Sequence, residues 1–250
     1  MASGDSESIP GVPKTPVFAT TRWTLVLAAA ETQCADSASA LEALCLTYWY
    51  PLYAFVRRKG HPPDEAKDLT QEFFAQLIEK KLYQAADRSR GKFRTFLLTA
   101  LQNFLNNQAR KANAQKRGGG AQVCSLDFQD AEGRYVHEPS HALTPEKLFE
   151  REWANTLLRQ VLTRLREEFI VSGQAERFDA LSAHLVEPDS SASYSELAAR
   201  LHMTEGAVKT AMHRLRRRYR ELYRQEIARV VGDDAEVDEE IRHLVSALAA

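Results

Sequence analysis

The chain has 250 residues, 44% of them hydrophobic, and a formal net charge of -1. This length and hydrophobic content can fill two small helical cores, and the longest apolar stretch near the start, residues 25–30, is far shorter than the ~20 residues that a membrane-spanning helix needs. The cysteines, Cys34, Cys45 and Cys124, are odd in number and lie far apart, so neither a disulfide framework nor a zinc site is expected. We expect a soluble cytoplasmic protein with no cofactor, no metal and no membrane contact.

Charged residues are distributed unevenly, and the small net charge conceals blocks of opposite sign. Residues 88–117 contain eight basic residues and no carboxylate, and residues 201–225 contain seven basic and two acidic ones. Residues 226–250 contain seven acidic and two basic ones, which cancel much of that positive charge. Two separate basic segments indicate a protein that binds nucleic acid at two places.

The spacing of apolar residues divides the chain into two helical segments. Apolar residues recur at helical spacing before and after a stretch that contains Gly118–Gly120 and Pro139 and has no sustained period, and no strand-like alternation is evident. Thr144 and Pro145 predict the start of a capped helix. The predicted fold is all-α, with two helical domains joined by a flexible linker. The predicted segments are a disordered leader (1–18), a first helical domain (19–115, with breaks at 60–63 and 87–91), a linker (116–143), a second helical domain (144–225) and an acidic tail (226–250).

Residues 194–218 predict a helix, a tight turn and a second helix. Thr204 is placed to cap the second helix, and His202 occupies a turn position that Gly often fills. The predicted shared core consists of Leu197, Ala198, Leu201, Met203, Val208, Met212 and Leu215.

The outward side of that second helix is polar and basic. An ordinary helical hairpin with a solvated basic face is the simpler alternative, but the hairpin, the cap and the arginines coincide, which favours DNA binding. The candidate major-groove residues are Thr204, Glu205, Gly206, Lys209, Thr210, His213 and Arg214. The candidate phosphate contacts are Arg216, Arg217, Arg218 and Arg220.

Two segments of the first domain also carry distinctive surfaces. In residues 61–78, Leu69, Phe73 and Leu77 form one helical face and acidic residues form another; alone, that acidic face is typical of solvated surface. In residues 91–111, Phe93, Leu97, Leu101, Phe104 and Leu105 turn inward. The outward stripe of Thr95, Thr99, Gln102, Asn103, Asn106 and Arg110 has hydrogen-bonding groups and no carboxylate, which suits contact with nucleic acid.

These three segments, in this order, resemble the extracytoplasmic-function (ECF) group of bacterial RNA polymerase sigma factors. Residues 64–74 resemble the family's polymerase-binding helix, residues 91–97 and onward resemble its minus-ten recognition helix, and the hairpin from Tyr194 resembles its minus-thirty-five reader. Each motif alone is moderately specific, whereas three in the right order with a linker between them form a strong signal. The resemblance covers about residues 41–224.

The resemblance implies that the protein is a sigma factor rather than an enzyme. Its implied partners are core RNA polymerase and promoter DNA, and an anti-sigma factor or another regulatory protein is a possible further partner. Implied polymerase contacts are Asp64, Asp68, Gln71 and Glu72. Implied minus-ten contacts are Arg88, Arg90, Lys92, Asn103, Asn106, Asn107 and Arg110. Implied minus-thirty-five contacts are Thr204, Glu205, Gly206, Lys209, Thr210, His213, Arg214 and Arg217.

Other interpretations are weaker. A free-standing helix-turn-helix regulator would bind operator DNA alone as a dimer, but it would not explain the carboxylate-free helix of the first domain. An enzyme is disfavoured because no catalytic motif is present. The acidic tail predicts a short amphipathic helix; it either shields the arginines of residues 216–220 or packs on the second domain.

Overall fold

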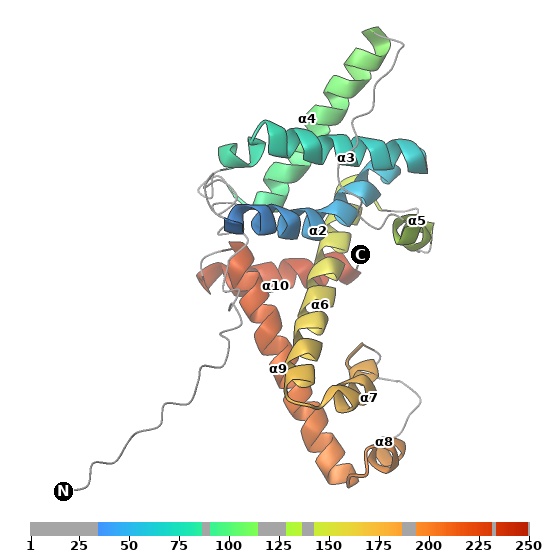
Figure 1. Ribbon diagram of the computed structural model, residues 1–250, viewed down its shortest axis with the longest axis vertical. Coiled ribbons are helices and arrows are strands. Elements are labelled where there is room, and N and C mark those ends of the chain that lie inside the picture. Colours follow the sequence, from blue (N-terminus) through green and yellow to red (C-terminus); the bar gives the residue numbers. More distant parts are fainter. Residues whose placement is uncertain are drawn as a thin grey trace, which may run out of the picture.

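Figure 1 shows the computed structural model of the chain, which describes residues 35–86, 91–114, 129–136, 143–186, 194–231 and 234–249. All of the regular structure in these residues is helical and none is strand, which confirms the all-α prediction. The predicted leader (1–18) and the candidate contacts Arg88 and Arg90 lie outside the described residues. The helices are α2 (Ala35–Arg58), α3 (Pro63–Glu79), the 3-10 helix η1 (Leu82–Ala85), α4 (Phe93–Ala114), α5 (Gln129–Val136), α6 (Pro145–Val171), α7 (Ala175–Val186), α8 (Tyr194–Arg200), α9 (Glu205–Val231) and α10 (Asp234–Ala249).

The predicted break at residues 60–63 separates α2 from α3. Gly60 adopts a φ of 99°, a conformation that glycine reaches without the strain a side chain would add. Pro62 is the N-cap of α3 and Pro63 is its first residue, where a fixed φ and a missing N–H cost nothing. The chain therefore turns sharply and α3 packs back on α2.

Aromatic side chains join α2, α3 and α4. The Phe73 ring in α3 lies 5.8 Å from the Phe104 ring in α4, and Tyr48 in α2 meets Phe93 edge-on at 5.7 Å. Offset and edge-on pairs of this kind add about 0.5–1.5 kcal/mol each beyond the area they bury. These contacts fix the direction of α4, which carries the predicted minus-ten stripe.

Part of the predicted linker is an ordered helix, α5. Arg57 in α2 binds the Glu132 carboxylate with a 2.7 Å contact from Nη2, and the Arg134 guanidinium lies 3.4 Å from the Tyr50 ring centroid. The predicted linker, residues 116–143, thus contains one helix, residues 129–136, that contacts α2. Eight residues make about two helical turns, which is too short for a clear period, and long-range ion pairs supply the order.

Two long helices, α6 and α9, run side by side along the molecule (Figure 1). Each contributes to both hydrophobic clusters: Trp153 and Ile227 pack with α2, α3 and α4, whereas Val161 and Met212 pack with α7 and α8. The two clusters thus meet within α6 and α9, because the first half of α6 packs on α2. Figure 1 places α3 and α4 at one end of the molecule and α7, α8 and the start of α9 at the other.

The C-terminal helix α10 packs against α9 and α6 beneath α2 (Figure 1). Val237 and Leu244 are buried, and Ile241 and Leu248 are partly buried against the first cluster. The amphipathic helix predicted for the tail is confirmed. Within the described ranges, no helix combines the length and apolar character needed to cross a membrane.

Candidate nucleic-acid interface

The acidic side of α3 faces solvent. Asp64, Asp68 and Glu72 are exposed and Gln71 is half-buried. Their spacing places them on one side of the helix, while Phe73 on the opposite side is 1% exposed and anchors α3 in the core. The four residues predicted to contact polymerase therefore form a single acidic surface.

The outer stripe of α4 is also accessible. Asn103, Asn106, Asn107 and Arg110 are exposed, and the end of α4 extends beyond α3 in Figure 1. The side chains predicted to turn inward include Leu97 and Leu101, which are 1% and 0% exposed. Donors and acceptors of the stripe can therefore reach a strand laid along this helix.

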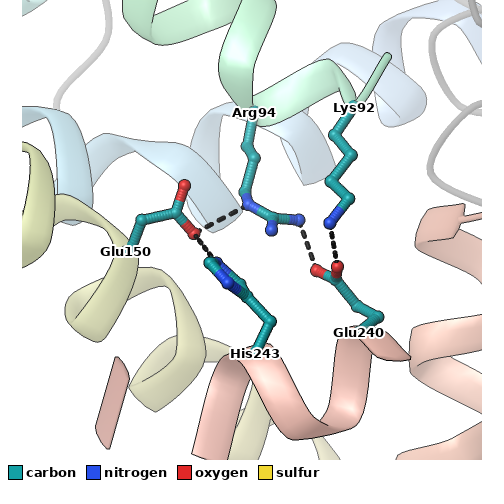
Figure 2. Close-up of polar contacts among 5 residues, drawn as sticks. All are labelled: Lys92, Arg94, Glu150, Glu240 and His243. Atoms are coloured by element: carbon teal, nitrogen blue, oxygen red, sulfur yellow. Dashed lines mark hydrogen bonds and ion pairs between the residues drawn. The ribbon is translucent and has the colours of Figure 1, made fainter. Parts of the chain in front are cut away.

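Lys92, just before α4, is engaged within the protein. Its ammonium group donates to the Glu240 carboxylate of α10, as Figure 2 shows. The Lys92 side chain is 37% exposed, whereas that of Glu240 is only 1% exposed. Lys92 thus differs from the exposed minus-ten residues predicted on α4. Its charge is neutralised by Glu240, which lies 148 positions later in the chain.

Arg94 completes this cluster, which we call the α4–α10 clamp: Lys92, Arg94, Glu150, Glu240 and His243 (Figure 2). The Arg94 guanidinium donates to Glu150 at 2.8 Å and to Glu240 at 2.5 Å. It also lies 4.4 Å from the Trp153 ring centroid. With its side chain only 2% exposed, Arg94 is a buried tie between α4, α6 and α10.

The charge of Glu240 is stabilised by its two basic neighbours. Burial raises the pKa of this carboxyl, but the positive charge of Arg94 and hydrogen bonds from Lys92 and Arg94 outweigh it, so the pKa is lowered from its ordinary value. Glu240 is therefore ionised at neutral pH. Residues 88–117 contain eight basic residues, but at least two of them, Lys92 and Arg94, are bound to Glu240 and do not add to the free basic surface.

The turn between α8 and α9 is closed by backbone hydrogen bonds. The Met203 N–H donates to the Ala198 carbonyl at 2.9 Å and the His202 N–H donates to that of Ala199 at 3.3 Å, the pattern of a Schellman C-cap. His202 adopts the left-handed φ of 50° that this motif needs. Thr204 then begins α9, because its Oγ1 accepts from the Ala207 N–H at 3.2 Å.

The predicted shared core of α8 and α9 is confirmed. All seven residues belong to the second hydrophobic cluster, and Leu197, Val208 and Leu215 are at most 2% exposed. Burial of that face turns the other side of α9 to solvent. The exposed residues there are Thr204, Glu205, Gly206, Lys209, Thr210, His213, Arg214 and Arg217.

The arginines that follow on α9 bind acidic residues and carbonyls close by. Arg218 makes a 2.6 Å contact with Glu168 of α6, and Arg217 contacts Glu221 at 2.9 Å. The acidic tail instead pairs Asp238 with Arg224, and Glu240 with the clamp. The expectation that the tail shields residues 216–220 does not match these contacts, because α10 turns back toward α4, away from the start of α9 (Figure 1).

Sequence reasoning missed Glu150, Glu240 and the structural role of Arg94. The only available signal was the absence of a carboxylate among residues 88–117, which left two cations at the start of a helix without a local partner. Their partners come from helices 56 and 146 residues away in the chain. Sequence spacing alone could not pair them.

Comparison with protein families identifies the chain. The model of the ECF sigma factor family matches residues 55–225, which include α3, α4 and most of α9. Because this match spans more than half of the chain, the protein belongs to the ECF sigma factor family, whose members act in transcription initiation. Comparison with curated proteins and with solved structures gave no match.

Proposed function

We propose that this sigma factor directs core RNA polymerase to promoters by holding two DNA elements at opposite ends of its helical body. The observation that carries the proposal is the placement of the exposed α4 stripe and the exposed start of α9 at the two ends of the molecule (Figure 1). The acidic surface of α3 lies on neither stripe and is free for polymerase. Three surfaces on three helices thus serve three contacts.

The start of α9 suits a duplex groove. Lys209, Thr210 and His213 offer hydrogen-bonding groups from successive turns of one exposed helix face, as a recognition helix in the major groove requires. Arg217 lies further along the same helix, where a contact with phosphate adds salt-dependent affinity. We assign this surface to the minus-thirty-five element.

The α4 stripe suits an opened strand. Asn103, Asn106 and Asn107 can pair with base edges while Arg110 contacts the backbone. Capture of an unstacked base costs a few kcal/mol, and contacts with the exposed strand offset that cost. Melting of the minus-ten element would then be a population shift that needs no covalent chemistry.

The acidic surface of α3 suits a basic partner on the polymerase. Contacts between complementary charges mainly set orientation and association rate, and they weaken as salt is raised. Asp68→Lys should therefore slow assembly with core polymerase and leave DNA binding by the free protein unchanged. Glu79→Lys, at the exposed end of the same helix, is the matched control.

Run-off transcription with purified core polymerase on genomic fragments, followed by mapping of start sites, tests the proposal. We expect initiation at a limited set of sites that share two sequence elements. The bound protein should protect both elements. Lys209→Ala should lose protection of the upstream element alone, and Asn106→Ala should lose protection of the downstream element alone. Duplex binding as an independent dimer, with no initiation by core polymerase, would contradict the proposal and indicate a free-standing regulator.

A further inference from the structure

The α4–α10 clamp lies where the proposed minus-ten surface begins. Glu240 is 1% exposed and accepts hydrogen bonds from both Lys92 and Arg94 (Figure 2). We propose that α10 is an autoinhibitory helix, which covers the base of α4 in the free protein and is displaced when polymerase and promoter are engaged. This inference rests on the proposed function and on the expectation, from the family resemblance, that Lys92 also contacts the opened strand.

The chemistry of the clamp matches that of the ligand it would exclude. A carboxylate that accepts charge-assisted hydrogen bonds from a lysine and an arginine makes the same kind of contact as a phosphate oxygen of DNA. Glu240 and a DNA phosphate therefore compete for Lys92. Such an intramolecular competitor lowers the apparent affinity by the fraction of molecules in which Lys92 is free.

The α10 helix covers only the base of α4. Asn103 and Arg110 in the outer part of α4 remain exposed, as do Lys209 and Arg214 on α9. The free protein can therefore present its duplex-binding surface while the base of α4 is held closed. The predicted effect is a block on strand capture that does not extend to duplex binding.

Two features of α10 favour its displacement from the base of α4. It lies beyond residues 55–225, which the family shares, and a cavity of about 280 Å³ opens beside it, lined by Glu146, Lys147, Glu150, His243, Ser246 and Ala247. Incomplete packing along this side forfeits part of the dispersion attraction between α6 and α10. On the other side, Val237 and Leu244 are buried, so the closed state persists until polymerase and DNA favour the open one.

Full-length Glu240→Gln tests the inference, with Glu239→Gln as the matched control because Glu239 is exposed on the same helix. The two probes are a single strand carrying the minus-ten sequence of a mapped start site and a duplex carrying the minus-thirty-five sequence. We expect Glu240→Gln to bind the single strand about fivefold or more tightly than wild type, with duplex binding unchanged. Glu239→Gln should match wild type on both probes.

Amide hydrogen exchange of the wild-type protein provides a second measurement. The amides of residues 236–248 should be protected in the free protein and lose protection when core polymerase and promoter are added. Should Glu240→Gln lose helical content, Asp238→Asn replaces it, because this exposed residue pairs α10 with Arg224 at the surface. That variant should shift strand binding in the same direction by a smaller factor.

Two results would overturn the inference: a folded Glu240→Gln variant that binds the single strand no more tightly, or an α10 that stays equally protected in the initiation complex. Either result would make α10 a permanent part of the fold. Failure of the proposed function is distinguished by run-off transcription, in which the wild-type protein would give no initiation with core polymerase. Loss of α10 protection on strand binding alone would still support the inference.

Discussion

Arg57 of α2 and Glu132 of α5 form a two-pronged ion pair, with Nη2 to Oε1 at 2.7 Å and Nε to Oε2 at 2.9 Å. Tyr53 donates a further hydrogen bond to the same carboxylate. Glu132 thus helps to tie the helix within residues 116–143 to the first hydrophobic cluster.

Replacement of Glu132 by Gln should lower the free energy of unfolding by about 1.5–3 kcal/mol, because hydrogen bonds to charged groups contribute that much. Urea unfolding followed by circular dichroism measures the change. Glu146→Gln serves as the control, since the Lys59–Glu146 contact is 3.9 Å long and both side chains are more than 40% exposed, where ion pairs contribute little. Equal effects of the two substitutions would show that α5 is not held by this pair.

The same pair predicts how stability depends on pH. Burial raises the pKa of Glu132, but hydrogen bonds from Arg57 and Tyr53 outweigh it, and the pKa lies below its ordinary value. Between the folded and unfolded pKa values the unfolded state binds more protons, so this contribution is complete above about pH 5 and is lost as the pH falls through the folded pKa. The stability difference between wild type and Glu132→Gln should therefore be largest near pH 7 and shrink below about pH 4.5. A difference that stays constant down to pH 3 would exclude an ionised Glu132 as its source.

The helices were predictable wherever a local signal marks them. The break at Gly60, the capped start at Thr144 and the shared core around Val208 each follow from residues within a few positions of one another, and each matches the structure. These features depend on backbone conformation and helical period, both of which are local.

Ion pairs between residues far apart in the chain could not be predicted from the sequence. Lys92 appeared to be a free DNA contact because its partner, Glu240, lies 148 residues away. Likewise α5 appeared to be linker because its order depends on Arg57, which lies 75 residues from Glu132. Ionic contacts between helices have no periodic signature, so only the folded chain reveals which charges remain available.

His202 provides a test of the turn before α9. Its φ of 50° costs an L-residue about 1–2 kcal/mol, whereas glycine there loses about 0.5–1 kcal/mol more backbone entropy on folding than other residues do. His202→Gly should therefore raise the free energy of unfolding by about 0.5–1 kcal/mol, the difference between these two effects. His202→Ala, which keeps the strain, should give no increase; urea unfolding distinguishes the two variants.

Groove contacts and phosphate contacts on α9 can be separated by substitution of single residues. Lys209 is exposed in the second turn of the helix, and its ammonium lies 5.8 Å from the Tyr194 ring centroid, which leaves its donors available to base edges. Lys209→Ala should therefore weaken duplex binding by about 1–3 kcal/mol and relax the preference at one base pair.

Arg217 should behave differently. Its side chain is 74% exposed and pairs with the neighbouring Glu221, so Arg217→Ala should weaken binding about equally for all sequences and reduce the salt dependence by about one phosphate contact. Arg166→Gln is the control for loss of one positive charge, because Arg166 lies on α6 and pairs with Asp179. Titrations at several salt concentrations, on duplexes with single base changes, measure both effects. If both α9 variants alter the salt dependence alone and neither alters base preference, this face of α9 binds phosphates without reading sequence.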